Sequence, residues 1–206
     1  MSKNTTKRSL LASVFALVLC VAMLVGSTFA WFTDTATTGV NKITSGKLDV
    51  KLSYAKDKNC TEWAEVKNTT KLFDDGALWE PGHTEVAYLK VENVGNLALK
   101  YQLSVNVANE VSGTNVNGDT IKLSNYIKMG VVENRSTSFA DRNAARAAVT
   151  DAGNIATYTK TGSIAANDTN AQYVALVVYM PETVGNEANY GTKAPSIDLG
   201  VKLAAT

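Results

Sequence analysis

The sequence predicts a mainly β protein: an antiparallel sandwich with one helix inserted late in the chain, preceded by an N-terminal apolar helix. Three observations support this fold class. Apolar and polar residues alternate with a period of two in several segments, and turn residues separate those segments. Strand patterns and helix patterns do not follow one another in the regular βαβ order. Such a pattern is typical of antiparallel sandwiches rather than of parallel α/β folds. We assign residues 42–206 to this single domain.

The N-terminal segment, residues 1–30, has the plan of a secretory signal peptide. Three basic residues among the first eight precede an apolar run over residues 10–25, and small residues follow at the −3 and −1 positions of a cleavage site between Ala30 and Trp31. An uncut membrane helix is the alternative, because residues 9–30 could cross the roughly 30 Å hydrocarbon core. We expect cleavage, since the small residues lie where a signal peptidase requires them.

Composition limits what the mature chain can do. Removing residues 1–30 takes away three of the 20 basic residues and none of the 19 acidic ones, which leaves a net charge of −2. Without a basic block, the chain is not expected to bind nucleic acid. The remaining length is sufficient for a hydrophobic core, since such a domain buries roughly 70% of its unfolded surface. Only Cys60 survives cleavage, so no intramolecular disulfide can form, and a lone, shielded thiol is expected.

The first half of the domain is predicted to contain four strands. Residues 48–54 alternate most clearly between apolar and polar side chains, and a short strand is expected at 62–66. Residues 86–92 and 97–107 form the next two. Because a four-residue turn joins them, we expect these two strands to pair with each other as an antiparallel hairpin.

The second half is predicted to contain three strands and the inserted helix. Ser138 followed three residues later by Asp141 matches a helix-capping pattern, and the alanine-rich stretch that follows predicts a helix from Phe139 to about Thr150. Three segments are predicted as polar, turn-rich or mobile loops: 109–120, 157–170 and 184–195. The strands are predicted at 126–133, 173–180 and 197–203.

Several motifs in this order resemble the TasA/camelysin family of exported biofilm-matrix and cell-surface proteins of Gram-positive bacteria. They are Thr28-Phe29-Ala30-Trp31-Phe32-Thr33-Asp34, Ser45-Gly46-Lys47-Leu48-Asp49, Glu80-Pro81-Gly82 and Glu92-Asn93-Val94-Gly95-Asn96-Leu97-Ala98. The resemblance covers roughly residues 8–107. It implies export through a SipW-type signal peptidase and the jelly-roll version of the sandwich.

The resemblance also implies how copies of the chain would assemble. Edge strands accept a further strand, and the expected donor is the freshly cut N-terminal segment, residues 31–41. Its expected anchors are Trp31 and Phe32, because burying one large aromatic side chain contributes roughly 2–3 kcal/mol, with Val40 and Ile43 as further anchors. The alternative is that this segment folds back onto its own domain as a first strand.

Camelysin-like proteins are described as metallo-endopeptidases, so a catalytic site has to be considered. Zinc proteases present two or three histidines at fixed spacing, as in H-E-x-x-H, and this chain contains one. His83 follows the Pro-Gly turn with Glu80 and Glu85 nearby, and we interpret it as an exposed turn residue. No calcium-loop motif and no Gly-x-Ser-x-Gly motif occurs. We therefore predict no catalytic, cofactor or metal residues.

Together these observations predict a secreted structural subunit of extracellular fibres or of the cell-surface matrix. It would self-associate by strand exchange, with an accessory matrix protein as a further partner, and it would meet the membrane only through the signal segment before cleavage. Two alternatives remain. One is a secreted camelysin-like metallo-endopeptidase. The other is a monomeric surface-binding module, in which Trp63 or Trp79 would provide an aromatic platform.

Overall fold

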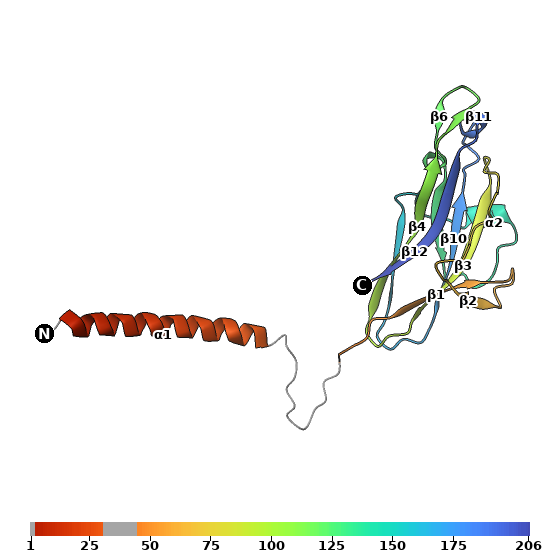
Figure 1. Ribbon diagram of the computed structural model, residues 1–206. Coiled ribbons are helices and arrows are strands. Elements are labelled where there is room, and N and C mark those ends of the chain that lie inside the picture. Colours follow the sequence, from red (N-terminus) through yellow and green to blue (C-terminus); the bar gives the residue numbers. More distant parts are fainter. Residues whose placement is uncertain (1–2, 31–44) are drawn as a thin grey trace. The chain divides into compact units, whose positions relative to one another are not determined.

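The computed structural model describes the backbone of residues 3–30 and 45–206 and the side chains of residues 7–21 and 45–206 (Figure 1). Two units are present, Met1–Ser45 and Gly46–Thr206. In the first unit, helix α1 spans Lys3–Ala30. Its described apolar side chains are exposed, with Leu11 at 72% and Phe15 at 68%. In the described part of the chain, no helix combines the length and apolar content that a membrane span requires.

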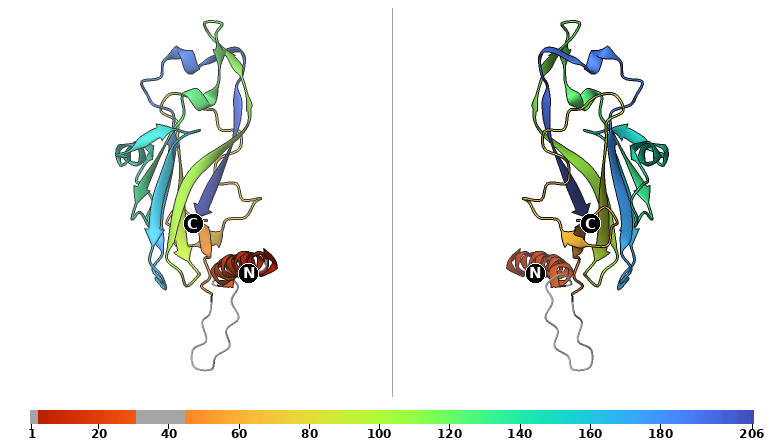
Figure 2. Two further views of the ribbon diagram at one scale, coloured as in Figure 1. Left: turned by 90° about the vertical axis from the view of Figure 1, so that its left-hand side faces the viewer. Right: turned by 90° about the vertical axis from the view of Figure 1, so that its right-hand side faces the viewer.

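The second unit is a sandwich of antiparallel sheets, which confirms the predicted fold class (Figures 1 and 2). The larger sheet has six strands in the order β2-β1-β3-β10-β7-β8. These strands are β1 (Val50–Ala55), β2 (Trp63–Glu65), β3 (Thr84–Asn93), β7 (Lys128–Glu133), β8 (Ala152–Asn154) and β10 (Gln172–Tyr179).

Two smaller sheets complete the second unit. The sheet β12-β4-β9 faces the larger sheet, and the sheet β11-β5-β6 lies at the end of the domain where β4 finishes (Figure 1). Their strands are β4 (Leu99–Val111), β5 (Gly113–Asn115), β6 (Thr120–Ile121), β9 (Thr159–Ile164), β11 (Tyr190–Lys193) and β12 (Ser196–Ala205). Two short 3₁₀ turns, Leu123–Asn125 and Asn186–Ala188, connect the layers.

The hydrophobic core lies between the two facing sheets and wholly within the second unit. Its fully buried side chains include Leu89 from β3, Leu103 from β4 and Leu176 from β10. Strand β10 is central in the larger sheet, as its long apolar run predicts, because a central strand needs apolar side chains on both faces. The residues of both buried clusters all belong to this second unit.

The prediction that β3 and β4 pair with each other as a hairpin is wrong. Strand β3 pairs with β1 and β10, whereas β4 pairs with β12 and β9 in the facing sheet. The turn between them bonds to the segment before β1, because Asn96 N–H donates to Lys47 O at 2.9 Å and Val94 N–H donates to Asp49 O at 3.0 Å. Each strand has one face buried, and crossing between sheets lets these two faces pack against each other.

The inserted helix is shorter than predicted and has a different cap. Helix α2 spans Arg142–Ala147, and the Asp141 carboxylate, rather than Ser138, accepts the capping hydrogen bond from Ala144 N–H at 2.7 Å. The segments 109–120 and 157–170 are not simple loops, since the first holds the end of β4, all of β5 and the start of β6, and the second holds β9. Alternate residues of β9 are exposed threonines and serine, so its sequence lacks the apolar alternation that marks strands.

Candidate functional site

Strand β12 is an edge strand with one side of its backbone free. Beyond its C-terminal end, Lys100 and Thr206 exchange both backbone hydrogen bonds, at 2.9 and 2.8 Å. An antiparallel ladder alternates bonded and non-bonded pairs. The backbone N–H and C=O groups of the even-numbered residues from 198 to 204 therefore point toward β4. The N–H and C=O groups of Leu199, Val201 and Leu203 therefore point away from it, and among the described residues no second strand pairs with β12.

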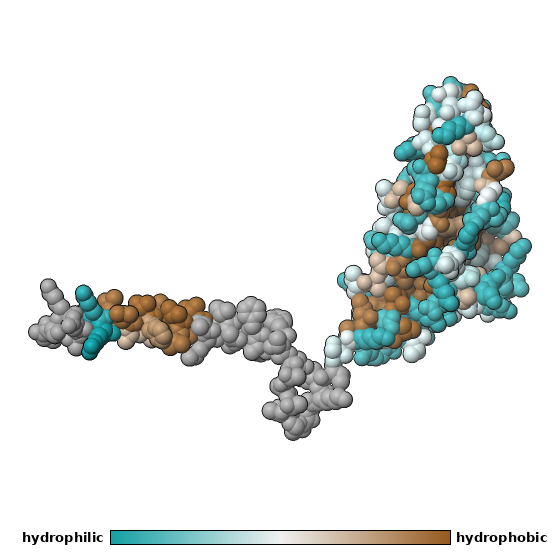
Figure 3. Space-filling model, in the orientation of Figure 1, coloured by the Kyte–Doolittle hydropathy of each residue, from teal (hydrophilic) through white to brown (hydrophobic). Residues whose placement is uncertain are grey.

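The core is incompletely covered along this same edge. Every inward side chain of β12 remains half-buried, whereas Leu99 and Leu103 on the adjacent β4 are 1% and 0% exposed. On the facing sheet, Val50 and Leu52 of β1 are half-buried as well, and both pack against the buried cluster that Leu203 also contacts. Figure 3 shows apolar residues gathered in a band over this face of the domain. We call this region, between β12 and β1, the open edge.

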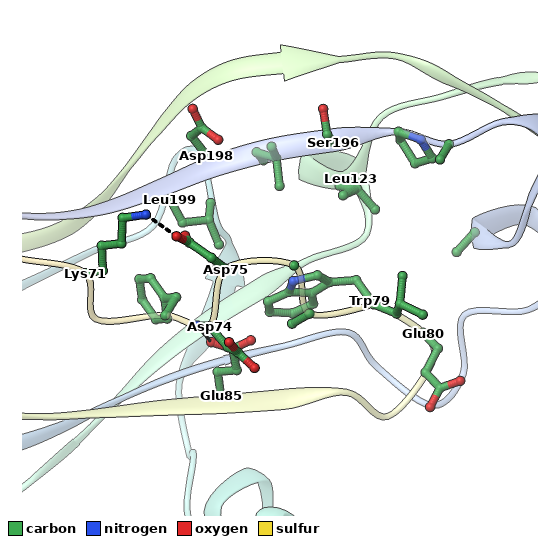
Figure 4. Close-up of a pocket in the computed structure, with 18 of the residues that line it drawn as sticks. Lys71, Asp74, Asp75, Trp79, Glu80, Glu85, Leu123, Ser196, Asp198 and Leu199 are labelled. Atoms are coloured by element: carbon green, nitrogen blue, oxygen red, sulfur yellow. Dashed lines mark hydrogen bonds and ion pairs between the residues drawn. The ribbon is translucent and has the colours of Figure 1, made fainter. Parts of the chain in front are cut away.

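A groove continues the open edge toward the start of β12. It lies between β12 and the strap, residues 66–83, which connects β2 to β3, and its cavity is about 720 Å³. Leu72 and Trp79 line it from the strap, and Ile197 and Leu199 line it from β12 (Figure 4). These four side chains also pack on the main core, so the groove is an opening into the core.

Hydrogen bonds and ring packing hold the strap over the core. The Glu85 carboxylate accepts a hydrogen bond from Asp74 N–H at 2.9 Å through Oε2, while its Oε1 lies 3.1 Å from His83 Nε2. The Trp79 and His83 rings have centroids 4.6 Å apart. An exposed ion pair between Lys71 and Asp75 adds a further link along the strap (Figure 4).

The expectation that His83 is exposed is wrong. Gly82 has φ of +89°, as the predicted Pro-Gly turn requires, and His83 N–H donates to Glu80 O at 2.9 Å. The His83 side chain is nevertheless only 10% exposed, because Trp79 covers it and Glu85 pairs with it. Sequence spacing identified the turn but could not foresee which side chain would cover the histidine.

The described residues do not fit a catalytic zinc. The chain has a single histidine, and its Nε2 is already engaged by Glu85. Glu80 lies apart from Glu85, across Trp79 (Figure 4). Among the residues with described side chains, no group of three His, Cys, Asp or Glu residues is arranged to hold a metal ion. A zinc site needs three protein ligands together with an open position, and this donor set does not supply them.

The residues predicted to act in export and assembly lie outside the described part of the structure. This holds for the side chain of Ala30 at the proposed cleavage site and for the proposed anchors Trp31, Phe32, Val40 and Ile43. Their roles therefore stay predictions. What the structure adds is the open edge, which the sequence analysis did not identify.

Neither tryptophan of the second unit forms an exposed platform. Trp63 is half-buried and packs edge-on against Tyr173, with ring centroids 5.3 Å apart, and Lys90 Nζ lies 5.9 Å from its ring. Trp79 packs against the core beside His83. Cys60 is buried, and burial, reinforced by the Asp57 carboxylate, raises the pKa of its thiol, which disfavours the reactive thiolate.

No curated protein matches the chain. The sequence model of one family, described as camelysin metallo-endopeptidase, matches residues 5–149, a stretch that runs from helix α1 to just beyond helix α2 and covers well over half of the chain. On this match the chain belongs to the TasA/camelysin family.

Proposed function

We propose that this protein is an exported structural subunit that assembles into extracellular fibres or cell-surface matrix by accepting a further strand along β12. Its family consists of exported or cell-surface proteins, which supports export. The observation that carries the proposal is the open edge, where β12 pairs with β4 alone among the described residues and its inward side chains stay half-buried.

An added strand would satisfy two needs of the open edge together. Its backbone would pair with the outward N–H and C=O groups of Leu199, Val201 and Leu203. Its apolar side chains would cover the half-buried residues of β12 and β1, and each Å² of apolar surface removed from water contributes about 25 cal/mol. The proposed donor is residues 31–41, with Trp31 and Phe32 filling the opening.

A secreted metallo-endopeptidase is the second candidate, and the family's description favours it. Against it stands the single histidine, which pairs with Glu85 and stacks on Trp79 instead of facing an open position. The two candidates differ in what abolishes function: a chelator would stop a metallopeptidase, whereas loss of the donor segment would stop assembly. An accessory matrix protein is a further proposed partner of assembly, and it does not distinguish the two candidates.

The donor can be tested by comparing two mature chains at matched concentration. One begins at Trp31 and the other at Lys42, and both retain the complete second unit. We expect the longer chain to form filaments by light scattering and negative-stain microscopy, and the shorter chain to remain a folded monomer. If both chains stay monomeric, assembly through this segment is refuted. Chelator-sensitive cleavage of a protein substrate would then support the peptidase.

The acceptor can be tested with a matched pair of proline variants. Val201→Pro removes an N–H that points away from β4, and the preceding Gly200 tolerates the restriction that proline imposes. Thr161→Pro makes the equivalent change at an outward position of β9, the opposite edge of the same sheet. We expect Val201→Pro to abolish filaments and Thr161→Pro to retain them. Equal loss with both variants would argue against β12 as the acceptor.

A further inference from the structure

The groove between the strap and β12 has the size and the apolar floor of a small-molecule site. Its cavity is about 720 Å³, within the range of roughly 300–1,000 Å³ that such sites occupy. Large apolar side chains line it from three parts of the chain: Leu72, Phe73 and Trp79 of the strap, Leu123 of the first 3₁₀ turn, and Ile197 and Leu199 of β12. All of these except Leu123 are only half-buried, so the folded chain leaves apolar surface exposed along the groove.

The charged side chains around this floor are mostly acidic. Among the described residues, those that line the groove are Lys71, Asp74, Asp75, Glu80, Glu85 and Asp198. Five carboxylates and one ammonium group give the lining a net charge of −4, whereas the mature chain as a whole carries −2. The rest of the mature chain is therefore positive overall, and its negative charge is concentrated at the groove. A cleft lined by one sign of charge attracts ligands of the opposite sign.

Lys71 compensates the carboxylates at one end of the groove only. It pairs with Asp75, and its pKa is raised by Asp75 and, to a smaller extent, by Asp198. Figure 4 shows Trp79 further along the groove, between Asp74 and Glu80. In the part of the chain with described side chains, no basic residue forms an ion pair with either of these two carboxylates. The uncompensated negative charge therefore lies at the Trp79 end.

We propose that this groove binds a small amphiphilic cation, a molecule with an aliphatic or aromatic body and one ammonium-like group. The body lies on the apolar floor beside Ile197 and Leu199, and the positive group lies against Trp79, between Asp74 and Glu80. The face of an aromatic ring attracts a cation, and tryptophan does so most strongly. The site does not depend on the function proposed above, because the strap and β12 form it within one chain.

The two parts of the groove select against other small molecules. An anionic amphiphile fits the same floor, but it brings a negative group against Asp74 and Glu80. A hydrophilic cation is attracted by the carboxylates, but it leaves the floor exposed to water, and exposed charge pairs alone contribute little. A molecule with both parts covers apolar surface and compensates the acidic end together.

Three simple probes separate these contributions. Octyltrimethylammonium has both parts, octyl sulfate reverses the charge, and tetramethylammonium lacks the apolar body. Each is added below its micelle concentration to ¹⁵N-labelled chain 31–206 that carries Trp31→Ala and Phe32→Ala, so that the proposed donor anchors cannot occupy the groove. The indole N–H signals of Trp79 and Trp63 are followed by NMR and assigned with Trp79→Phe. Trp63 is the internal control, because it lies on β2 outside the groove lining.

We expect octyltrimethylammonium to shift the Trp79 signal and to leave the Trp63 signal in place. Its affinity, from the same titration, should exceed that of either other probe by about tenfold, because each of them lacks one of the two contributions. Added salt should weaken its binding, since the carboxylates at the Trp79 end are exposed and therefore screened.

A matched pair of charge variants tests the acidic end. Asp74→Asn combined with Glu80→Gln removes the two carboxylates beside Trp79, and we expect affinity for octyltrimethylammonium to fall about fivefold. Glu62→Gln combined with Glu65→Gln removes the same charge from exposed residues that do not line the groove. This control should change the affinity by less than about twofold. An equal loss in both variants would mean that only the overall charge matters, which overturns the site.

Four further results would also overturn the proposal. Equal binding of octyl sulfate would mean that the groove is an apolar opening without charge selection. Equal shifts of the Trp63 and Trp79 signals would mean general adsorption of the amphiphile. A Trp79 signal that responds to none of the probes would mean that no such site exists. If that signal moved with protein concentration alone, a second copy of the chain would be the occupant. None of these results bears on strand acceptance by β12.

Discussion

Tyr158 is the residue whose environment makes the clearest prediction about pH. It is half-buried, and its hydroxyl donates toward Asp151 Oδ2 at 3.1 Å. Burial raises the pKa of Tyr158 to about 12, with the Asp151 carboxylate adding to the effect. The folded state therefore holds this proton more tightly than the unfolded state does, so the resulting stability is present below pH 10 and is lost as the pH rises from 10 to 12.

Urea unfolding at several pH values checks this prediction with Tyr158→Phe. We expect wild type to be the more stable at pH 9 and the difference between the two proteins to shrink between pH 10 and 12. Tyr190→Phe is the control, because Tyr190 is 56% exposed. A difference that stays constant over this range would contradict the assigned role of Tyr158.

At the residue scale, the sequence predicted backbone chemistry better than side-chain surroundings. The Pro-Gly turn was predictable because Gly82 accepts a positive φ that other residues resist. The burial of His83 was not predictable, because it depends on the contacts that Trp79 and Glu85 make with its ring. Local rules describe a residue and its chain neighbours, whereas burial depends on packing across the fold.

Helix α2 allows two candidate caps to be distinguished. The sequence pattern favoured Ser138, but the structure assigns the cap to Asp141, whose carboxylate accepts from Ala144 N–H. Removing an N-cap side chain costs about 1 kcal/mol. We therefore expect Asp141→Ala to lower the unfolding free energy by about that amount in urea denaturation, and Ser138→Ala to leave it nearly unchanged. A larger loss of unfolding free energy with Ser138→Ala than with Asp141→Ala would show that Ser138 is the cap, as the sequence predicted.

At the scale of elements, strands with apolar alternation were predictable and their partners were not. The strands at 86–92 and 97–107 were identified from alternation, yet they belong to different sheets. A four-residue turn is compatible with a hairpin and with a crossing between layers, so the connection alone does not decide the pairing. Strand β9 went unpredicted because threonine and serine occupy its outward positions.

At the scale of the whole molecule, the sandwich was predictable and its open edge was not. Alternation over residues 197–203 indicates a half-buried strand in any position of a sheet. Whether that strand has one neighbour or two depends on the order of all the strands, which is a property of the complete fold. The half-exposed inward side chains of β12 are visible only once β4 and β1 are in place.

An incomplete core should respond to a strand supplied from outside. Adding a synthetic peptide of residues 31–41 to the chain that begins at Lys42 should raise Tm with peptide concentration, because a ligand that binds only the folded state stabilises it by about 2.7 kcal/mol at 100 times Kd. For a domain of this size that corresponds to roughly 5–11 °C. Differential scanning calorimetry measures the shift.

Two controls connect any such shift to the open edge. A peptide with Trp31→Ala and Phe32→Ala should stabilise far less, because it lacks the aromatic side chains that would fill the opening. The Val201→Pro chain should not respond to the natural peptide, since its β12 no longer offers the outward N–H at that position. Equal shifts with both peptides would mean that binding does not use the anchors. If the peptide raised the Tm of the Val201→Pro chain as much as that of the unmodified chain, the acceptor strand would not be β12.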